Sequence, residues 1–206
     1  MPDPVLFPMA DQRPRERSDA ARNRAALLEA ATRMIDRCGI DSVTMEAVAE
    51  AAGVGKGTVF RRFDSREGLM AALLDHSETA WQASVMSGPP PLGPGAEPWD
   101  RLLAFGRSRL EATLGHADLI RNAGRAGSRS FAAYSFAALH VRYLLHELGV
   151  TGDLPLLATA LMAPLEAPIL DQQVRIEGLE VDRVYDGWAD LARRVVSPSG
   201  GAATRT

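Results

Sequence analysis

Apolar residues recur at helical spacing along most of the chain, and clusters of proline and glycine separate the helical segments. The first helix is expected to begin at Ser18 and to end at Cys38, with Gly39 as the left-handed residue behind it. Later helices are expected at residues 45–52, 56–63, 65–86, 99–115, 131–148, 154–173 and 181–195, with a break near Pro164 because proline removes a backbone donor. The sequence therefore predicts an all-α fold.

A short helix, a glycine corner and a second short helix follow one another within residues 42–68. Thr44 can cap the first helix, and Gly53 can supply the left-handed conformation that ends it. The packing face of the first helix consists of Met45, Val48, Ala49 and Ala52. The second helix, about Lys56 to Phe63, turns Val59 and Phe63 inward and leaves small or cationic side chains outside. This arrangement predicts a helix-turn-helix.

The outer surface of the second helix is cationic in a chain whose net charge is −3. Between residues 56 and 66 there are four basic side chains and one acidic side chain, a local charge of +3. Lys56 is the only lysine, and Gly57 beside it leaves room for a phosphate backbone. Positive charge on a helix of this size favours binding in the major groove of DNA, the alternative being an ordinary solvated helix face.

Residues 20–74 resemble the N-terminal region of the TetR family of bacterial transcriptional regulators. The matching stretches are Arg37-Cys38-Gly39, Thr44-Met45-Glu46-Ala47-Val48-Ala49, Ala52-Gly53-Val54, Gly57-Thr58-Val59-Phe60 and Phe63-Asp64-Ser65-Arg66-Glu67-Gly68-Leu69. The resemblance implies backbone contacts to DNA from Thr44, Phe60 and Arg66. It implies positions near base edges for Lys56, Gly57, Thr58 and Arg61, and Arg62 completes the predicted DNA-binding set. The family usually has tyrosine at position 60, so phenylalanine loses a phosphate hydrogen bond, a loss of about 1 kcal/mol.

The same resemblance implies a three-helix DNA-binding domain followed by a helical domain that binds a ligand and dimerises. The expected boundaries are a disordered arm at residues 1–17, the DNA-binding domain at 18–66, the effector-binding and dimerisation domain at 67–198, and a disordered tail at 199–206. The implied function is a homodimeric regulator, most often a repressor, that binds a near-palindromic operator. A small, largely apolar effector would release it from double-stranded DNA.

Residues 131–148 are apolar on more than one side, which predicts a central, buried helix. Tyr134, His140 and Tyr143 interrupt it with polar groups that can bond a ligand in an apolar cavity. The alternative for each is a core residue whose hydrogen bonds are satisfied within the protein. The candidate effector-pocket residues are Trp81, Phe105, Tyr134, His140, Tyr143 and Met162.

The last helix repeats apolar residues at near-heptad spacing, and its apolar stripe is wide for a single helix. In TetR-like proteins the last two helices form a four-helix bundle with a second subunit, and this pattern is compatible with such a bundle. The alternative is packing within the monomer. The candidate dimer-interface residues are Leu161, Leu165, Val181, Val184, Tyr185, Trp188 and Leu191.

Several other classes of protein do not fit the sequence. The histidines form no metal pair with a glutamate, and no serine has a nucleophile-elbow setting, so we predict no catalytic residue, metal or cofactor. The single cysteine, Cys38, excludes an intramolecular disulfide and is expected to be buried. Neither a signal-peptide pattern nor an apolar run of about 18 residues is present, which predicts a cytoplasmic protein without a membrane partner.

Two alternative functions stay open beside the regulator. One is an architectural or adaptor DNA-binding protein without an effector, although no DNA-bending role requires the large second domain. The other is an enzyme that uses the helical C-terminal domain, for which the sequence offers no catalytic constellation.

Overall fold

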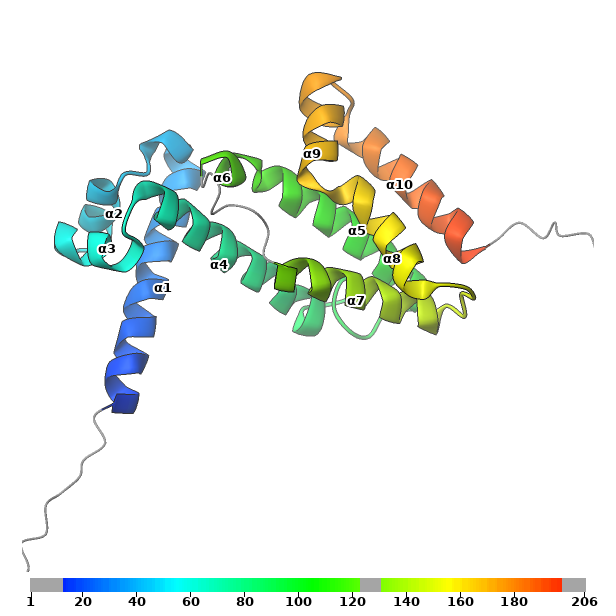
Figure 1. The fold of residues 1–206 in the computed structure, drawn as a ribbon, viewed down its shortest axis with the longest axis horizontal. Coiled ribbons are helices and arrows are strands. Elements are labelled where there is room, and N and C mark those ends of the chain that lie inside the picture. Colours follow the sequence, from blue (N-terminus) through cyan, green and yellow to red (C-terminus); the bar gives the residue numbers. More distant parts are fainter. Residues whose placement is uncertain (1–12, 123–130, 198–206) are drawn as a thin grey trace, which may run out of the picture. The chain divides into compact units, whose positions relative to one another are not determined.

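The computed structural model describes residues 13–122 and 131–197, and every regular element within these ranges is a helix (Figure 1). The contacts divide the chain into two compact units, residues 1–73 and residues 74–206. The boundary between the units lies within α4 (Arg66–Ser87), and the predicted domain boundary lies at the start of the same helix. The all-α fold class predicted from the sequence is confirmed.

The first unit contains α1 (Arg13–Cys38), α2 (Met45–Ala51), α3 (Lys56–Phe63) and the first turns of α4. The predicted helix start at Ser18 is wrong, because α1 already includes residues 13–17. Pro14 is compatible with this start, since the first turn of a helix leaves its N–H groups without intrahelical partners. The expectations for residues 1–12 and 198–206 lie outside the described residues.

The core of the first unit is the apolar face that the helical spacing predicts. Its buried members include Leu27, Leu28, Ala31, Val43, Val48, Val59, Leu69, Met70 and Leu73. Cys38 is the exception, because its side chain is exposed and the prediction that it is buried is wrong. It is the last residue of α1, and at Gly39 (φ 78°) the chain leaves the helical direction, so the apolar stripe ends before Cys38.

The second unit contains the rest of α4, α5 (Pro98–Gly115), α6 (Ala117–Asn122), α7 (Phe131–Glu147), α8 (Leu154–Met162), α9 (Ala167–Leu170) and α10 (Val181–Val196). The predicted break near Pro164 is confirmed. The α-helix stops at Met162, a 3₁₀ turn covers Ala163–Leu165, and Pro168 lies in the first turn of α9. A π-helical turn (Asp171–Ile176) precedes α10.

The prediction that α7 is buried nearly all round is wrong for part of its surface. The side chains of Leu139 and Tyr143 are 54% and 48% exposed, whereas Val141, Leu144 and Leu145 are fully buried. α7 contacts α5 and α8, and these neighbours cover only part of its circumference. An apolar strip of α7 therefore remains at the surface of the second unit.

Helices α5 and α10 approach closely at one glycine. A Cβ atom at Gly106 would overlap the indole ring of Trp188, so only glycine leaves room for this ring. The indole Nε1 of Trp188 donates a hydrogen bond to the carbonyl oxygen of Leu161, 2.8 Å away. Trp188 thus joins α5, α8 and α10 in the core of the second unit.

Candidate nucleic-acid interface and effector site

The corner between α2 and α3 has the geometry that the sequence predicts. The Thr44 hydroxyl accepts a hydrogen bond from the Ala47 backbone N–H at 3.1 Å, which caps α2. Gly53 has φ 66° and ends α2, and α3 begins after Gly55. The helix-turn-helix is therefore present at residues 44–63.

The outer surface of α3 carries most of the residues that were predicted to contact DNA. Val59 and Phe63 are buried against the rest of the first unit, which fixes the rotation of the helix about its axis. The opposite surface consists of Lys56, Gly57, Phe60, Arg61 and Arg62, all exposed, and Thr58, which is half-buried. This surface is small and cationic, as major-groove binding requires.

Lys56 is held within the first unit by two contacts. Its ammonium forms an ion pair with the carboxylate of Glu46 in the first turn of α2. The same ammonium lies 5.5 Å from the centre of the Phe60 ring, within range of a cation–π interaction. The hydrogen bond from Lys56 is the main cause that lowers the pKa of Glu46 below its ordinary value. Sequence spacing does not reveal this pair, because it depends on the angle between α2 and α3.

Arg66, the first residue of α4, is half-buried and bound to backbone carbonyls. Its Nε donates to the carbonyl oxygen of Val43 at 3.0 Å, and its Nη2 donates to that of Ile40 at 3.2 Å. These bonds fix the segment that leads into α2. They give Arg66 a bracing role, while a contact from Arg66 to DNA stays a prediction.

Residues 27–73 of the chain match the family model for bacterial regulatory proteins of the tetR family. Residues 27–73 thus form a DNA-binding domain of the TetR family. The resemblance seen in the sequence is therefore confirmed. This is a family of transcriptional regulators and not of enzymes, in agreement with the prediction that the chain is no enzyme.

A curated relative is the HTH-type transcriptional regulator TtgR from Pseudomonas putida. It is 36% identical over 61 residues, which cover 30% of this chain and 29% of TtgR. The chain thus matches less than a third of the length of that relative.

Two solved structures cover the second unit as well. A TetR-family transcriptional regulator from Rhodococcus sp. has a TM-score of 0.62 at 19% identity, covering 86% of this chain and 100% of that chain. FadR from Thermus thermophilus, a TetR-family repressor in complex with lauroyl-CoA, has a TM-score of 0.54 at 18% identity, covering 89% and 98%. At these identities, the two structures show a shared fold.

Four of the six predicted pocket residues lie in one aromatic cluster of the second unit, which we define as Trp81, Phe105, Phe136, His140 and Tyr143. The Trp81 ring centre lies 5.4 Å from that of Phe105 and 6.2 Å from that of Phe136. The imidazole of His140 lies 5.3 Å from Phe105 and 6.4 Å from both Phe136 and Tyr143. The other two predicted residues, Met162 and Tyr134, belong to the surrounding core, in which Met162 is buried and Tyr134 half-buried. Phe136 is a fifth member of the cluster that was not among the predicted pocket residues.

A buried ion pair lies beside this cluster. Arg109 on α5 is 1% exposed and Glu78 on α4 is 7% exposed, and Nη1 of Arg109 lies 2.9 Å from both carboxylate oxygens. The guanidinium also lies 4.6 Å from the centre of the Trp81 ring, whose Nε1 donates to the Ser108 hydroxyl at 2.9 Å. The sequence pattern alone does not predict this pair. The available signal was that Arg109 falls four residues after Phe105, on the buried face of α5.

His140 is a buried polar group within the aromatic cluster, 8% exposed. Burial, and secondly the charge of Arg101, lower the pKa of His140 from 6.5 to about 4, so the imidazole is neutral at pH 7. Its Nε2 has no hydrogen-bond partner among the described residues. The Nε of Arg101 on α5 is buried and likewise lacks such a partner there.

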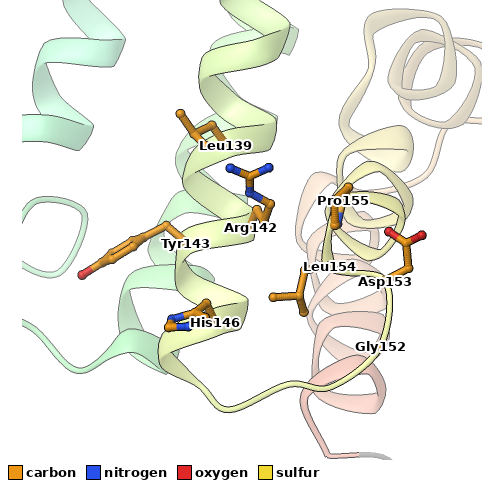
Figure 2. A pocket seen from close by; sticks show the side chains of 8 residues that line it. All are labelled: Leu139, Arg142, Tyr143, His146, Gly152, Asp153, Leu154 and Pro155. Atoms are coloured by element: carbon orange, nitrogen blue, oxygen red, sulfur yellow. The ribbon is translucent and has the colours of Figure 1, made fainter.

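A groove of about 530 Å³ lies between α7 and the start of α8. It is lined by Leu139, Arg142, Tyr143, His146, Gly152, Asp153, Leu154 and Pro155 (Figure 2). The Tyr143 ring projects from α7 away from α8, whereas the Leu154 side chain projects toward α7 (Figure 2). Tyr143 thus belongs to the groove and to the aromatic cluster at the same time.

The predicted dimer-interface residues fall into two groups by exposure. Leu161, Leu165 and Trp188 are buried within their own chain, as the alternative of packing within the monomer requires. The half-buried group consists of Val181, Val184, Tyr185 and Leu191 on α10. Only this second group has surface left for contact with another molecule.

Among the described residues, no group of three or more His, Cys, Asp or Glu side chains is placed to hold a metal ion. Within the same residues, no single helix is long and apolar enough to cross a membrane. The segments Leu154–Leu165 and Ala167–Ile176 reach the required composition only as a pair, with a 40° bend between them.

Proposed function

We propose that this chain is a cytoplasmic, ligand-responsive DNA-binding regulator. We propose that it acts as a repressor, the most frequent role in the TetR family. It binds a near-palindromic operator as a homodimer, with α3 of each copy in a major groove, and a small, largely apolar effector releases it. Two recognition helices that read successive major grooves lie about 34 to 36 Å apart. The dimer can adopt one subunit arrangement with this spacing and another without it. The effector shifts the equilibrium between them only by the difference in its affinity for the two arrangements.

The observation that carries the proposal is the outer surface of α3. Burial of Val59 and Phe63 turns Lys56, Arg61 and Arg62 outward together, on the second helix of a helix-turn-helix. The whole chain is net negative, so this local positive charge offers phosphates a defined docking surface. Residues 27–73, which include this helix, match the family model for bacterial regulatory proteins of the tetR family, and TtgR, a relative over 61 residues, carries the name of a transcriptional regulator.

The second unit supports the effector part of the proposal. It contains an aromatic cluster with a buried histidine, the kind of mostly apolar site with few polar groups that binds small molecules. FadR of Thermus thermophilus, which shares the fold, is described in complex with lauroyl-CoA. α4 leaves the first unit and enters the second, where Arg109 and Ser108 hold its residues Glu78 and Trp81. A shift of these contacts can therefore move α4.

The DNA part is tested with the double variant Lys56→Ala/Arg61→Ala. A duplex is first selected from a random library with the wild-type protein, and its affinity is measured by fluorescence anisotropy. We expect the variant to lose at least tenfold in affinity for the selected duplex. The control Arg33→Ala/Arg37→Ala removes the same charge from exposed positions on α1. Unchanged sequence-specific affinity in the Lys56/Arg61 variant would remove the assigned role of α3.

The dimer part is tested by sedimentation and by DNA affinity together. Val184→Asp/Leu191→Asp places two charges on half-buried apolar positions of α10, and we expect it to yield monomers that bind the selected duplex weakly. Arg175→Asp, at an exposed position of the π-helical turn before α10, is the control. A wild-type protein that stays monomeric at micromolar concentration, with full affinity for the duplex, would contradict the dimer.

A further inference from the structure

Two buried nitrogen atoms of the second unit share one unusual property. Nε2 of His140 on α7 and Nε of Arg101 on α5 are both buried without a hydrogen-bond partner among the described residues. Most buried polar side-chain atoms in proteins have a partner, and an unpaired one is destabilising because it has lost its hydrogen bonds to water. Arg101 lies one helical turn before Phe105 on α5, and the Phe105 ring centre lies 5.3 Å from that of His140 on α7. We treat the two groups as one polar patch between α5 and α7, which agrees with the effect of the Arg101 charge on His140.

The charge of this patch is positive and uncompensated within the described residues. Arg101 forms no ion pair there, whereas Arg109 on the same helix is paired with Glu78. The imidazole of His140 is neutral at pH 7, because burial and the charge of Arg101 both oppose its protonation. The patch therefore offers one full positive charge and one neutral imidazole nitrogen.

The surroundings of the patch are aromatic. The ring centre of His140 lies 5.3 Å from that of Phe105 and 6.4 Å from that of Phe136, and Trp81 contacts both phenylalanine rings. Such rings favour offset or edge-on contacts with another aromatic group at centre distances of roughly 4.5 to 7 Å. A flat aromatic body is thus better matched to this wall than a flexible chain.

We propose that the aromatic cluster binds an aromatic carboxylate, whose oxygens accept hydrogen bonds from Nε of Arg101 and from Nε2 of His140. Arg101 supplies the counter-charge, and His140 donates from its Nε2–H tautomer. This deepens the proposed function, on which it rests, by assigning a chemical class to the effector of the same site.

Other ligand classes fit this patch less well. A purely apolar molecule would leave both nitrogens unpaired, which is destabilising. A phosphate dianion needs more donors and more positive charge than one arginine provides, and Arg109 is already engaged by Glu78. A cation would be repelled by Arg101. A planar group with one negative charge, such as a carboxylate, balances the charge of Arg101 and can accept a hydrogen bond from each of the two nitrogen atoms.

Access to the site passes Tyr143. Its ring is 48% exposed, lines the groove between α7 and α8, and lies 6.4 Å from the imidazole of His140. It is the cluster member with the greatest contact with solvent, because Trp81 and Phe105 are buried and Phe136 is half-buried. Tyr143 is therefore the member of the aromatic cluster that an entering ligand meets first.

The test uses 2-naphthoate as the probe and 2-naphthamide as its neutral counterpart, with calorimetry on the full chain. We expect the acid to bind wild type at least tenfold more tightly than the amide. Arg101→Met is expected to abolish this preference, and His140→Phe, which keeps the ring and removes the nitrogens, to reduce acid affinity at least fivefold. Arg101→Gln, which removes the charge, and His140→Leu, which removes the donor, replace these variants if circular dichroism shows that they do not fold.

Arg142→Met is the matched control. Arg142 is an exposed cation on α7, two residues after His140, and lines the outer groove. We expect this variant to bind 2-naphthoate as wild type does. If 2-naphthoate fails to bind, binds no better than the amide, or loses affinity only in Arg142→Met, the proposal is overturned. In the last case the carboxylate is held in the groove instead.

Duplex binding is measured on the same preparations, which separates this proposal from the regulator itself. A protein that binds a selected duplex but shows no preference for the carboxylate contradicts only the ligand class. If the protein binds 2-naphthoate through Arg101 and His140 but has no affinity for any duplex, the carboxylate site is supported and the proposed regulatory function is contradicted.

Discussion

The ammonium of Lys56 pairs with the carboxylate of Glu46, so the first residue of α3 is tied to the first turn of α2. Both side chains are largely exposed, and the ammonium also lies over the ring of Phe60. Phosphates that approach α3 therefore compete with a carboxylate for the only lysine of the chain. Glu46 opposes DNA in two ways, because it neutralises Lys56 and repels phosphates.

Replacing Glu46 by Gln is expected to strengthen binding to unrelated duplexes more than binding to a selected operator. The free Lys56 can then neutralise one more phosphate, so the slope of log K against log salt becomes steeper by about 0.9. Anisotropy titrations with both duplexes at several salt concentrations measure this change.

Glu50→Gln is the control for Glu46→Gln, because Glu50 lies on the same helix, is exposed, and loses the same charge. We expect its salt slope to equal that of wild type. Equal slopes in all three proteins would mean that the contact between Glu46 and Lys56 has no influence on DNA binding.

Replacing Arg66 by Met is expected to destabilise the first unit by about 1 to 3 kcal/mol. The change removes the hydrogen bonds to the carbonyl oxygens of Val43 and Ile40, which lie in the segment that positions α2. Chemical unfolding of the variant measures the loss. Arg62→Met, at an exposed position of α3, should leave stability unchanged and weaken DNA binding. If Arg66→Met is as stable as wild type but binds DNA poorly, Arg66 acts on DNA directly.

The ion pair of Lys56 with Glu46 and the hydrogen bonds of Arg66 show which features the spacing of residues along the sequence predicts and which it does not. The helix-turn-helix follows from capping, glycine and apolar periodicity within residues 44–63, so Thr44, Gly53 and Val59 are found where the sequence predicts them. The partners of Lys56 and Arg66 depend on how helices pack, and residues 10 and 23 positions away supply them. The periodicity of apolar residues within each helix does not determine the angles at which two helices pack.

The second unit shows the same limit. The periodicity of α7 predicts its buried stripe, but the exposed side of the helix also carries apolar residues, Leu139 and Tyr143. Apolar pattern alone assigned both to the interior. The ion pair between Glu78 and Arg109 joins residues 31 positions apart on two helices, and only the packing of α4 against α5 brings them together.

Glu78→Gln is expected to destabilise the second unit by about 3 to 5 kcal/mol, because it leaves the buried charge of Arg109 without its counter-charge. The double variant Glu78→Met/Arg109→Met removes both charges and should recover much of that loss. Urea unfolding measures both. Glu111→Gln breaks an exposed ion pair with Arg107 on the same helix as Arg109 and should change stability little. A double variant less stable than either single variant would contradict this account.

Gly106→Ala is expected to destabilise the second unit by about 1 to 3 kcal/mol, since the added methyl group overlaps the ring of Trp188. The ring cannot retreat freely, because its Nε1 is bonded to the carbonyl oxygen of Leu161. Gly115→Ala, in the same helix, meets no atom within 4 Å and should be neutral or stabilising. Thermal unfolding of the two variants distinguishes them, and equal melting temperatures would show that α5 and α10 are not tightly packed at Trp188.

The burial of His140 predicts a loss of stability as pH falls. Its pKa is about 4 in the folded protein and 6.5 as the ordinary value, so between these values the unfolded chain binds the proton and the folded protein does not. The contribution of His140 to the free energy of unfolding is therefore fully present above pH 6.5. It is lost as the pH drops toward 4, by about 2 kcal/mol between pH 7 and pH 5.

His140→Phe removes the titrating imidazole and should show a smaller difference between the unfolding free energies at the two pH values. His146→Phe, at an exposed position of the same helix, should keep the wild-type difference. If His140→Phe and wild type lose the same stability, the imidazole is already protonated near its ordinary pKa in the folded protein, and the buried patch with Arg101 is more hydrated than its exposure indicates.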